Sequence, residues 1–152
     1  MVQWVDNKYL AIEFDSQPLI GIRYILPSMS QEEVKSIKKY PFINKCSLEI
    51  SLTDKKKNKF YKFVIPKGYC FDGASVPRFF WRIIGSNTDN KFLVAAMVHD
   101  FMCENHDCVG FDRAFSTKIF DSLLSVSQVG KLKRFFMKNS VDIFQKAFCH
   151  WE

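Results

Sequence analysis

The chain has 152 residues, 47% apolar and 25% charged, which fits a single globular domain and excludes a disordered chain. A formal charge of +6 suits an acidic partner, but the basic residues are spread along the chain, so nucleic-acid binding has no support beyond that charge. The five cysteines include no CxxC pair, which argues against a disulfide framework and a ribbon-type zinc site and indicates a reducing, cytoplasmic setting.

The first part of the chain predicts short strands. Residues 2–27 alternate loosely and are rich in Val, Tyr, Ile and Phe, and Leu19–Leu26 is the clearest strand among them. The first fifteen residues include acidic side chains and lack the apolar core of a signal peptide, and no apolar run approaches membrane-spanning length. We therefore expect no membrane span and no secretion by a signal peptide.

A short helix and a β-hairpin follow. Ser30 is a candidate N-cap with Glu33 three residues later, and the helix that it opens ends before Pro41. Alternating residues 46–53 and 59–65 flank the charged segment 54–58, which predicts a hairpin. The three lysines of that segment could touch phosphates, but we interpret them as a solvated hairpin tip.

The second half of the chain is helical in pattern. We expect helices over residues 78–84, 87–106, 112–126 and 127–151, with Asp112 capping the third and Ser125 or Ser127 the fourth. The fourth helix carries an apolar stripe, which we predict to dock on the protein's own core. The alternatives are that the stripe binds a membrane or a partner. Its members are Leu132, Phe135, Phe136, Ile143, Phe144 and Phe148.

These elements predict an α+β fold in one domain, residues 1–152. Residues 1–66 are mainly β, with an antiparallel sheet, a hairpin and one short helix. Residues 67–81 form a loop. Residues 82–152 supply three to four helices that pack against the sheet.

The loop between the two halves, GYCFDGASVPRFFW, concentrates residues typical of functional sites. Pro66 ends the preceding strand, and Gly68 and Gly73 permit backbone angles closed to other residues. Asp72 and Ser75 then lie where a helix opens near Pro77. They either act directly in a site or only satisfy the turn and the cap.

A second constellation is the pair His99-Asp100 inside the predicted helix. In one interpretation both converge with Asp72 as a metal site or an acid–base pair, with Ser75 as nucleophile or substrate contact. In another, a helical face binds zinc through His99, Cys103 and His106, together with Cys108. In a third, His99 is a core histidine, and Asp72 and Asp100 are buried partners of Arg78 or Arg113.

The combined motifs resemble a small phage and prophage family of unknown function. Its pattern is Gly-x-x-Thr-Asp-Gly-Ala-Ser-Val-Pro-Arg, then Ala-Ala-x-x-His-Asp, then Arg-x-x-Ala-Asp-x-x-Phe, and the resemblance covers about residues 66–124. The matching positions are Gly68, Asp72, Gly73, Ser75, Pro77, Arg78, Ala95, Ala96, His99, Asp100, Arg113 and Phe120, with Trp81 beside them.

The resemblance implies a phage- or prophage-encoded protein in the host bacterial cytoplasm or the virion. It brings no established activity. From the residue types themselves, Asp72, Ser75, His99 and Asp100 are candidate catalytic residues, and Asp72, His99 and Asp100 candidate ligands of a divalent metal in a small hydrolase. Arg78, Trp81 and Arg113 become candidate substrate contacts. The alternative is a non-catalytic virion or tail component, or a protein that binds phage or host proteins, with the same residues as a structural network. Phe71 and Ser116-Thr117 depart from the pattern, and Thr117 lacks the charge of the family's Asp.

Overall fold

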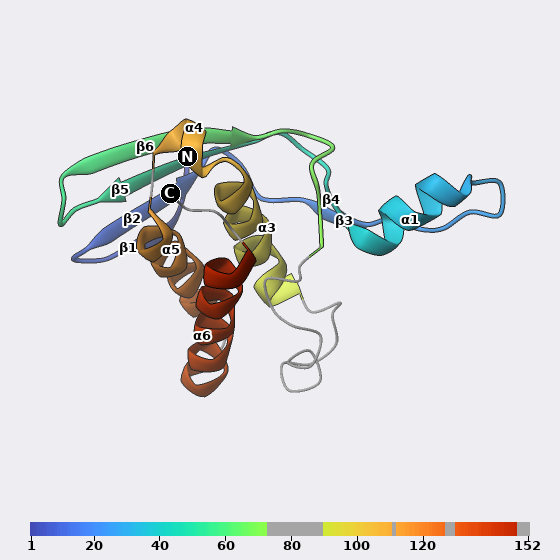
Figure 1. Cartoon of the computed structure of the whole chain (residues 1–152). Coiled ribbons are helices and arrows are strands. Elements are labelled where there is room, and N and C mark those ends of the chain that lie inside the picture. The colour runs from blue at the N-terminus through green and yellow to red at the C-terminus, as the bar shows by residue number, and fades with distance from the viewer. Residues whose placement is uncertain (73–89, 111, 127–129, 149–152) are drawn as a thin grey trace.

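The computed structural model describes residues 1–72, 90–110, 112–126 and 130–148 (Figure 1). The helix predicted over residues 78–84 lies outside these ranges. The strands are β1 Val2–Asp6, β2 Leu10–Phe14, β3 Ile20–Ile22, β4 Phe42–Asn44, β5 Leu48–Asp54, β6 Lys59–Ile65 and β7 Cys70–Phe71. The helices are α1 Gln31–Lys39, α3 Asn90–Glu104, α4 His106–Val109, α5 Arg113–Val126 and α6 Lys131–Phe148.

The larger sheet has the antiparallel order β1-β2-β5-β6. Its two central strands alternate, and they turn Leu10, Ile12 and Phe14 from β2 and Leu48, Ile50 and Leu52 from β5 into the core. The predicted hairpin is confirmed, with β5 and β6 paired from Leu48↔Ile65 to Asp54↔Lys59. Asn58 closes its turn at φ 51°, and the carboxylate of Asp54 accepts from the amides of Lys56 and Lys57, both at 3.1 Å.

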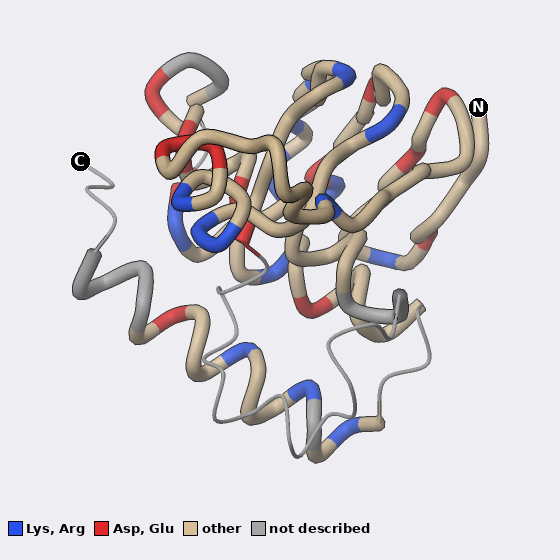
Figure 2. Tube along the Cα trace, turned by 90° about the vertical axis from the view of Figure 1, so that its right-hand side faces the viewer, with Lys and Arg blue, Asp and Glu red and all other residues tan. Residues whose placement is uncertain are grey.

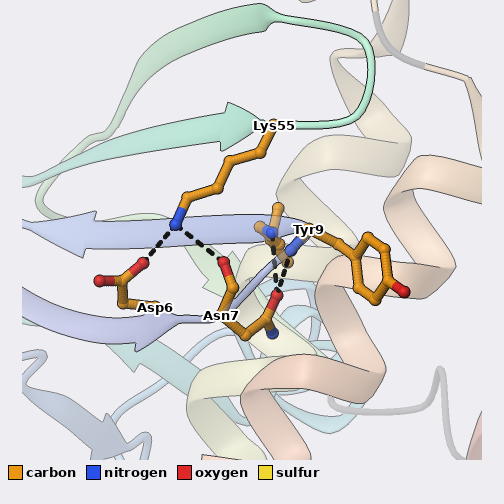
Figure 3. Close-up of polar contacts among 5 residues, drawn as sticks. Asp6, Asn7, Tyr9 and Lys55 are labelled. Atoms are coloured by element: carbon orange, nitrogen blue, oxygen red, sulfur yellow. Dashed lines mark hydrogen bonds and ion pairs between the residues drawn. The ribbon is translucent and has the colours of Figure 1, made fainter.

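The lysines of this turn are partly engaged rather than simply solvated. Lys55 Nζ bonds the Asp6 carboxylate and, at 2.8 Å, the carbonyl of Asn7 in the β1–β2 turn (Figure 3). The Asn7 side chain in turn accepts from the amide of Tyr9 at 2.8 Å. Lys57 lies 3.4 Å from Asp112 at the start of α5. All four ionic side chains keep substantial solvent exposure, so these pairs position the turns more than they stabilise the fold.

The smaller sheet, β3-β4-β7, continues into a projecting arm that holds α1 (Figure 1). The predicted capping box is confirmed: the Ser30 hydroxyl accepts from the Glu33 amide at 3.2 Å, and the Ser30 amide donates to the Glu33 carboxylate at 2.7 Å. The strand predicted over Leu19–Leu26 is wrong in extent, because only β3 pairs with β4. After the Arg23 amide bonds the Pro41 carbonyl at 2.8 Å, Pro41 has no N–H to continue the ladder.

The helical half confirms the α+β prediction, with four helices after the strands in the ranges that the structure describes. Helix α3 is central, since the buried residues Leu93, Ala96, Met97 and Met102 occur around its circumference, and α5 packs along it. Helix α5 begins as predicted at an Asp112 cap, where the Phe115 amide donates to the Asp112 carboxylate at 2.7 Å. No helix within the described ranges is long and apolar enough to cross a bilayer.

The prediction that the apolar stripe of α6 docks on the core is wrong for the four members whose side chains the structure describes. Among the described side chains of α6, the buried ones are Met137 and Val141, one turn apart, and α6 packs on α5 through this narrow face. The stripe faces solvent, with exposed fractions of 70% for Leu132, 60% for Phe135, 43% for Phe136 and 66% for Ile143. The side chains of Phe144 and Phe148 lie outside the described part of the structure.

The predicted start of this helix also needs correction. Helix α6 begins at Lys131, not near residue 127, and Ser125 lies in the last turn of α5. The Ser125 hydroxyl accepts from Arg134 at 3.0 Å, so it joins the two helices sideways and does not cap α6. Ser127 falls outside the described residues.

Candidate functional site

The site begins at a tight turn that joins the two sheets. Gly68 has φ +91°, a conformation that favours glycine, and the Tyr69 amide closes the turn onto the Pro66 carbonyl at 3.2 Å. The buried Asn44 side chain donates to the carbonyls of Ile65 and Pro66, at 3.2 and 3.1 Å. The turn is therefore fixed on both sides, and it delivers Tyr69 and β7 to the face of α3.

Aromatic packing holds Tyr69 in place. Its ring lies edge-on to Phe101 of α3, with centroids 5.3 Å apart, and stacks on Phe71 at 6.2 Å. Phe101 also stacks on Phe63 of β6 at 5.5 Å. These contacts link both sheets to α3 and leave the phenol group at a polar edge of the aromatic cluster.

Helix α3 presents two carboxylates toward that phenol. Asp100 and Glu104 are one turn apart and so share a helical face. The Tyr69 hydroxyl donates to Glu104 Oε2 at 3.0 Å. Asp100 is 12% exposed, whereas Glu104 lies at the surface end of the face.

Asp72 belongs to the same electrostatic cluster. Burial raises the pKa of Tyr69 strongly, and the negative charges of Asp100, Glu104 and Asp72 raise it further. The pKa of Glu104 is also raised, first by burial and then by the charge of Asp100, against the opposing effect of the Tyr69 hydrogen bond. The loop aspartate and the helix aspartate, distant in sequence, therefore act on one phenol.

His99 adjoins the Asp100 of this cluster but is buried in the core. It is 2% exposed, and its ring packs edge-on against Phe120 of α5 with centroids 5.3 Å apart. Its Nδ1 is 3.8 Å from Asp100 Oδ1, which is beyond hydrogen-bond length. A side chain this buried can orient Asp100, but direct contact with a substrate would require its neighbours to move.

The zinc alternative finds no support at Cys103 and His106. Cys103 is disulfide-bonded, which departs from the predicted reduced state and removes its thiolate as a ligand. The ring nitrogens of His106 lie 2.8 Å from the Cys103 carbonyl and 3.1 Å from the Asp107 carboxylate. Among the described side chains, Asp72, His99 and Asp100 included, no three His, Cys, Asp or Glu are arranged to hold a metal ion.

The remaining predicted residues are placed as follows. Arg113 lies 3.2 Å from Asp142 of α6, so it pairs there and not with Asp72 or Asp100. Ser116 and Thr117 are buried in α5. Ser75, Arg78 and Trp81 lie outside the described residues, as do Gly73 and Pro77.

Sequence reasoning missed the central roles of Tyr69 and Glu104. Both had a readable signal: Tyr69 follows the glycine that opens the loop, and Glu104 follows Asp100 by one helical turn. A pocket of about 470 Å³ elsewhere, between β1, α5 and α6, was also not predicted. Its ionic groups are already paired, since Arg134 lies 3.4 Å from Asp121 and Asp6 bonds Lys55.

Comparison with known proteins gives a family and no activity. The chain is 39% identical over 51 residues to the uncharacterized protein y4jT of Sinorhizobium fredii (strain NBRC 101917 / NGR234). That stretch is 34% of this chain and only 15% of the relative. No solved structure matches the chain. A family model matches residues 47–141, which include Tyr69, Asp72, His99, Asp100 and Glu104. The chain therefore belongs to the family described as "Protein of unknown function (DUF1353)".

Proposed function

We propose that this chain is a phage- or prophage-encoded hydrolase whose reaction takes place at the carboxylates around Tyr69. One observation carries the proposal: the carboxylates of Asp72 from the loop and of Asp100 and Glu104 from α3 gather around the partly buried phenol of Tyr69 and raise its pKa. Concentrations of mutually perturbed ionisable groups at the meeting of separate elements are typical of catalytic sites. The phage origin rests on the resemblance of the Asp-Gly-Ala-Ser-Val-Pro-Arg and His-Asp motifs.

The roles follow from the environments of the carboxyl groups. Glu104 has a raised pKa and so keeps its proton to higher pH, which suits a general acid that protonates a leaving group. Asp100, one turn away on the same face of α3, is the base that accepts a proton from the attacking water. His99 is the buried neighbour of Asp100, with its Nδ1 3.8 Å from Asp100 Oδ1.

The charge of the site favours an uncharged substrate. Three clustered carboxyl groups repel a phosphoester unless a cation intervenes. A cell-wall polymer is therefore the better candidate, with Ser75, Arg78 and Trp81 as its predicted contacts.

The test is release of soluble fragments from dye-labelled bacterial peptidoglycan by the full chain, measured with chelator and with added Mg²⁺ or Zn²⁺. We expect release by the parent and a loss on the order of 100-fold or more in Glu104→Gln and Asp100→Asn. Glu49→Gln is the matched control, because Glu49 pairs with Lys62 on the hairpin, 2.9 Å away. A folded parent that releases nothing under any of these conditions contradicts the proposal.

A second candidate is a non-catalytic component that binds phage or host proteins. The projecting arm favours it, because residues 20–44 precede the family match at residue 47 and expose apolar side chains. In that case Tyr69 and the carboxylates only fix the loop to α3. Mass spectrometry that finds the chain in purified virions, together with inactivity on peptidoglycan, would favour this candidate over the hydrolase.

A further inference from the structure

The pocket between β1, α5 and α6 lies apart from the carboxylates around Tyr69. In the sheet order β1-β2-β5-β6, β1 is one edge strand, whereas the aromatic contacts of Tyr69 run through Phe101 to Phe63 of β6, the opposite edge. Helix α5 packs against both β1 and α6 (Figure 1). The pocket among these three elements has a volume of about 470 Å³, which is enough for a small molecule.

A β-bulge in β1 shapes one wall of the pocket. The pairing of β1 with β2 steps from Gln3↔Glu13 to Val5↔Ile12, so Trp4 is an extra residue in β1. Consecutive side chains of a regular strand point to opposite faces of the sheet. Here Trp4 and Val5, although consecutive, both line the pocket. The bulge therefore turns the indole of Trp4 toward the pocket.

Trp4 gives the pocket an aromatic wall with an unsatisfied hydrogen-bond donor. Its ring packs on the buried Phe14 with centroids 4.8 Å apart. Its Nε1 is buried and has no hydrogen-bond acceptor among the described residues. A buried indole N–H usually has an acceptor, and a buried donor without one costs free energy. A small shift of a neighbouring side chain would let a molecule bound in the pocket supply that acceptor.

The ionic side chains that line the pocket are already paired. Arg134 Nε lies 3.4 Å from Asp121 Oδ1, and Arg134 Nη1 donates to the Ser125 hydroxyl at 3.0 Å. Asp6 bonds Lys55 of the hairpin turn (Figure 3). Figure 2 shows that acidic and basic positions are also interspersed over the body of the molecule. A charged ligand would have to break one of these pairs, whereas a neutral ligand can hydrogen-bond to the paired groups as they stand.

We propose that this pocket binds an uncharged saccharide. The C–H face of a sugar ring packs on aromatic and aliphatic side chains, which Trp4 and Val126 provide here. Sugar hydroxyls both donate and accept, so they match the Asp121 carboxylate, the Ser122 hydroxyl and the Trp4 N–H. A phosphorylated ligand fits less well, because its charge would meet the carboxylates of Asp6 and Asp121. The proposal concerns binding alone and does not depend on the hydrolase reaction.

Nuclear magnetic resonance of the full chain tests the proposal at Trp4 itself. The probes are two neutral disaccharides, cellobiose and N,N′-diacetylchitobiose, each titrated to about 10 mM. The chain has three tryptophans, so the indole N–H signal of Trp4 is assigned within a small set. We expect at least one of the two probes to shift this signal saturably. Digalacturonic acid, which carries a carboxylate on each ring, should bind at least about 10-fold more weakly.

Two variants that fill the pocket show whether the probe binds there. Ser122→Gln and Ser125→Gln each place a longer side chain in the lining, and each should weaken binding at least about 10-fold. Ser125 is exposed and Ser122 is partly exposed in α5, and glutamine is a good helix former, so folding should survive. Ser36→Gln is the matched control, because it makes the same substitution at an exposed position of α1 and should leave binding unchanged. Glu104→Gln should also leave the Trp4 shift unchanged, because Glu104 bonds Tyr69 at the separate site.

Three results would overturn the proposal. If neither neutral disaccharide shifts the Trp4 signal, the pocket is not a saccharide site. Equal binding by the parent and both pocket-filling variants would place the probe elsewhere on the molecule. A Trp4 shift caused by digalacturonic acid alone would show that the pocket selects a charged ligand. None of these results bears on peptidoglycan cleavage, so a failure here is distinguishable from a failure of the hydrolase proposal.

Discussion

The hydroxyl of Tyr69 donates to Glu104 at 3.0 Å and so joins the loop side of the molecule to the central helix. Tyr69 follows the strand-ending turn at Gly68, and Glu104 closes the last turn of α3. This contact places Asp72 of the loop and Asp100 of the His-Asp pair around one phenol.

Removing the Tyr69 hydroxyl tests how much its hydrogen bond to Glu104 contributes to the stability of the fold. Tyr69→Phe keeps the aromatic packing and deletes one hydrogen bond, so the free energy of unfolding should fall by about 1 kcal/mol. Urea unfolding measures the loss. Tyr24→Phe, at a tyrosine that is 73% exposed, should leave stability unchanged. Equal stability of the two variants would show that the Tyr69 hydroxyl contributes nothing to the fold.

Glu104→Gln should separate stability from function. The raised pKa of Glu104 means that the folded state binds its proton more tightly than the unfolded state. Stability therefore falls as the pH rises from the ordinary carboxyl pKa through the raised one. The glutamine variant lacks this fall, so at neutral pH it should be as stable as the parent or more stable, while peptidoglycan cleavage is lost. A clear loss of stability at pH 7 would contradict the assigned pKa direction.

The Asp112 cap gives a pH dependence of opposite sign. The hydrogen bond from the Phe115 amide lowers the pKa of Asp112, so its stabilisation is present at neutral pH and is lost as the pH falls below the ordinary aspartate range. Asp112→Ala should cost about 1 kcal/mol at pH 7 and little under acid conditions. Thermal unfolding of the parent and the variant at pH 7 and at acid pH measures this loss of stability. A cost that persists after acidification would show that the charge of Asp112 is not what stabilises the cap.

Two substitutions in α6 test which face it buries. Met137→Ala removes a fully buried side chain and should cost about 2–4 kcal/mol. Phe135→Ala removes a larger side chain that is 60% exposed and should change the stability of the monomer little. Denaturant unfolding at low protein concentration compares them. The reverse order would restore the original prediction that the aromatic stripe faces the core.

These outcomes show which features the sequence could predict. The capping box at Ser30, the cap at Asp112 and the hairpin around Asn58 depend on local chemistry, so their residues identify them. The buried face of α6 depends on what the rest of the fold places beside it. Phe135 and Phe136 are both large and apolar, yet they stay exposed, and the residues of α6 that are buried where it packs on α5 are Met137 and Val141.

The candidate site likewise has features that the sequence predicts and features that it does not. The His-Asp motif and the aspartate loop could be singled out by residue type, and Asp72 and Asp100 do act on one group. The depth of His99 and the bond from Tyr69 to Glu104 depend on the side chains that surround α3, which motif spacing does not describe. The projecting arm was likewise unpredictable, because the strand pattern of Leu19–Leu26 does not reveal that Tyr24 to Leu26 lack a pairing strand.

The pKa of the Glu104 carboxyl, followed by carbon-detected NMR during a pH titration, tests the central claim most directly. The account predicts a value above the ordinary glutamate range, a decrease in Asp100→Asn and a further increase in Tyr69→Phe. A Glu104 that titrates at or below the ordinary value and does not respond to either substitution would contradict it.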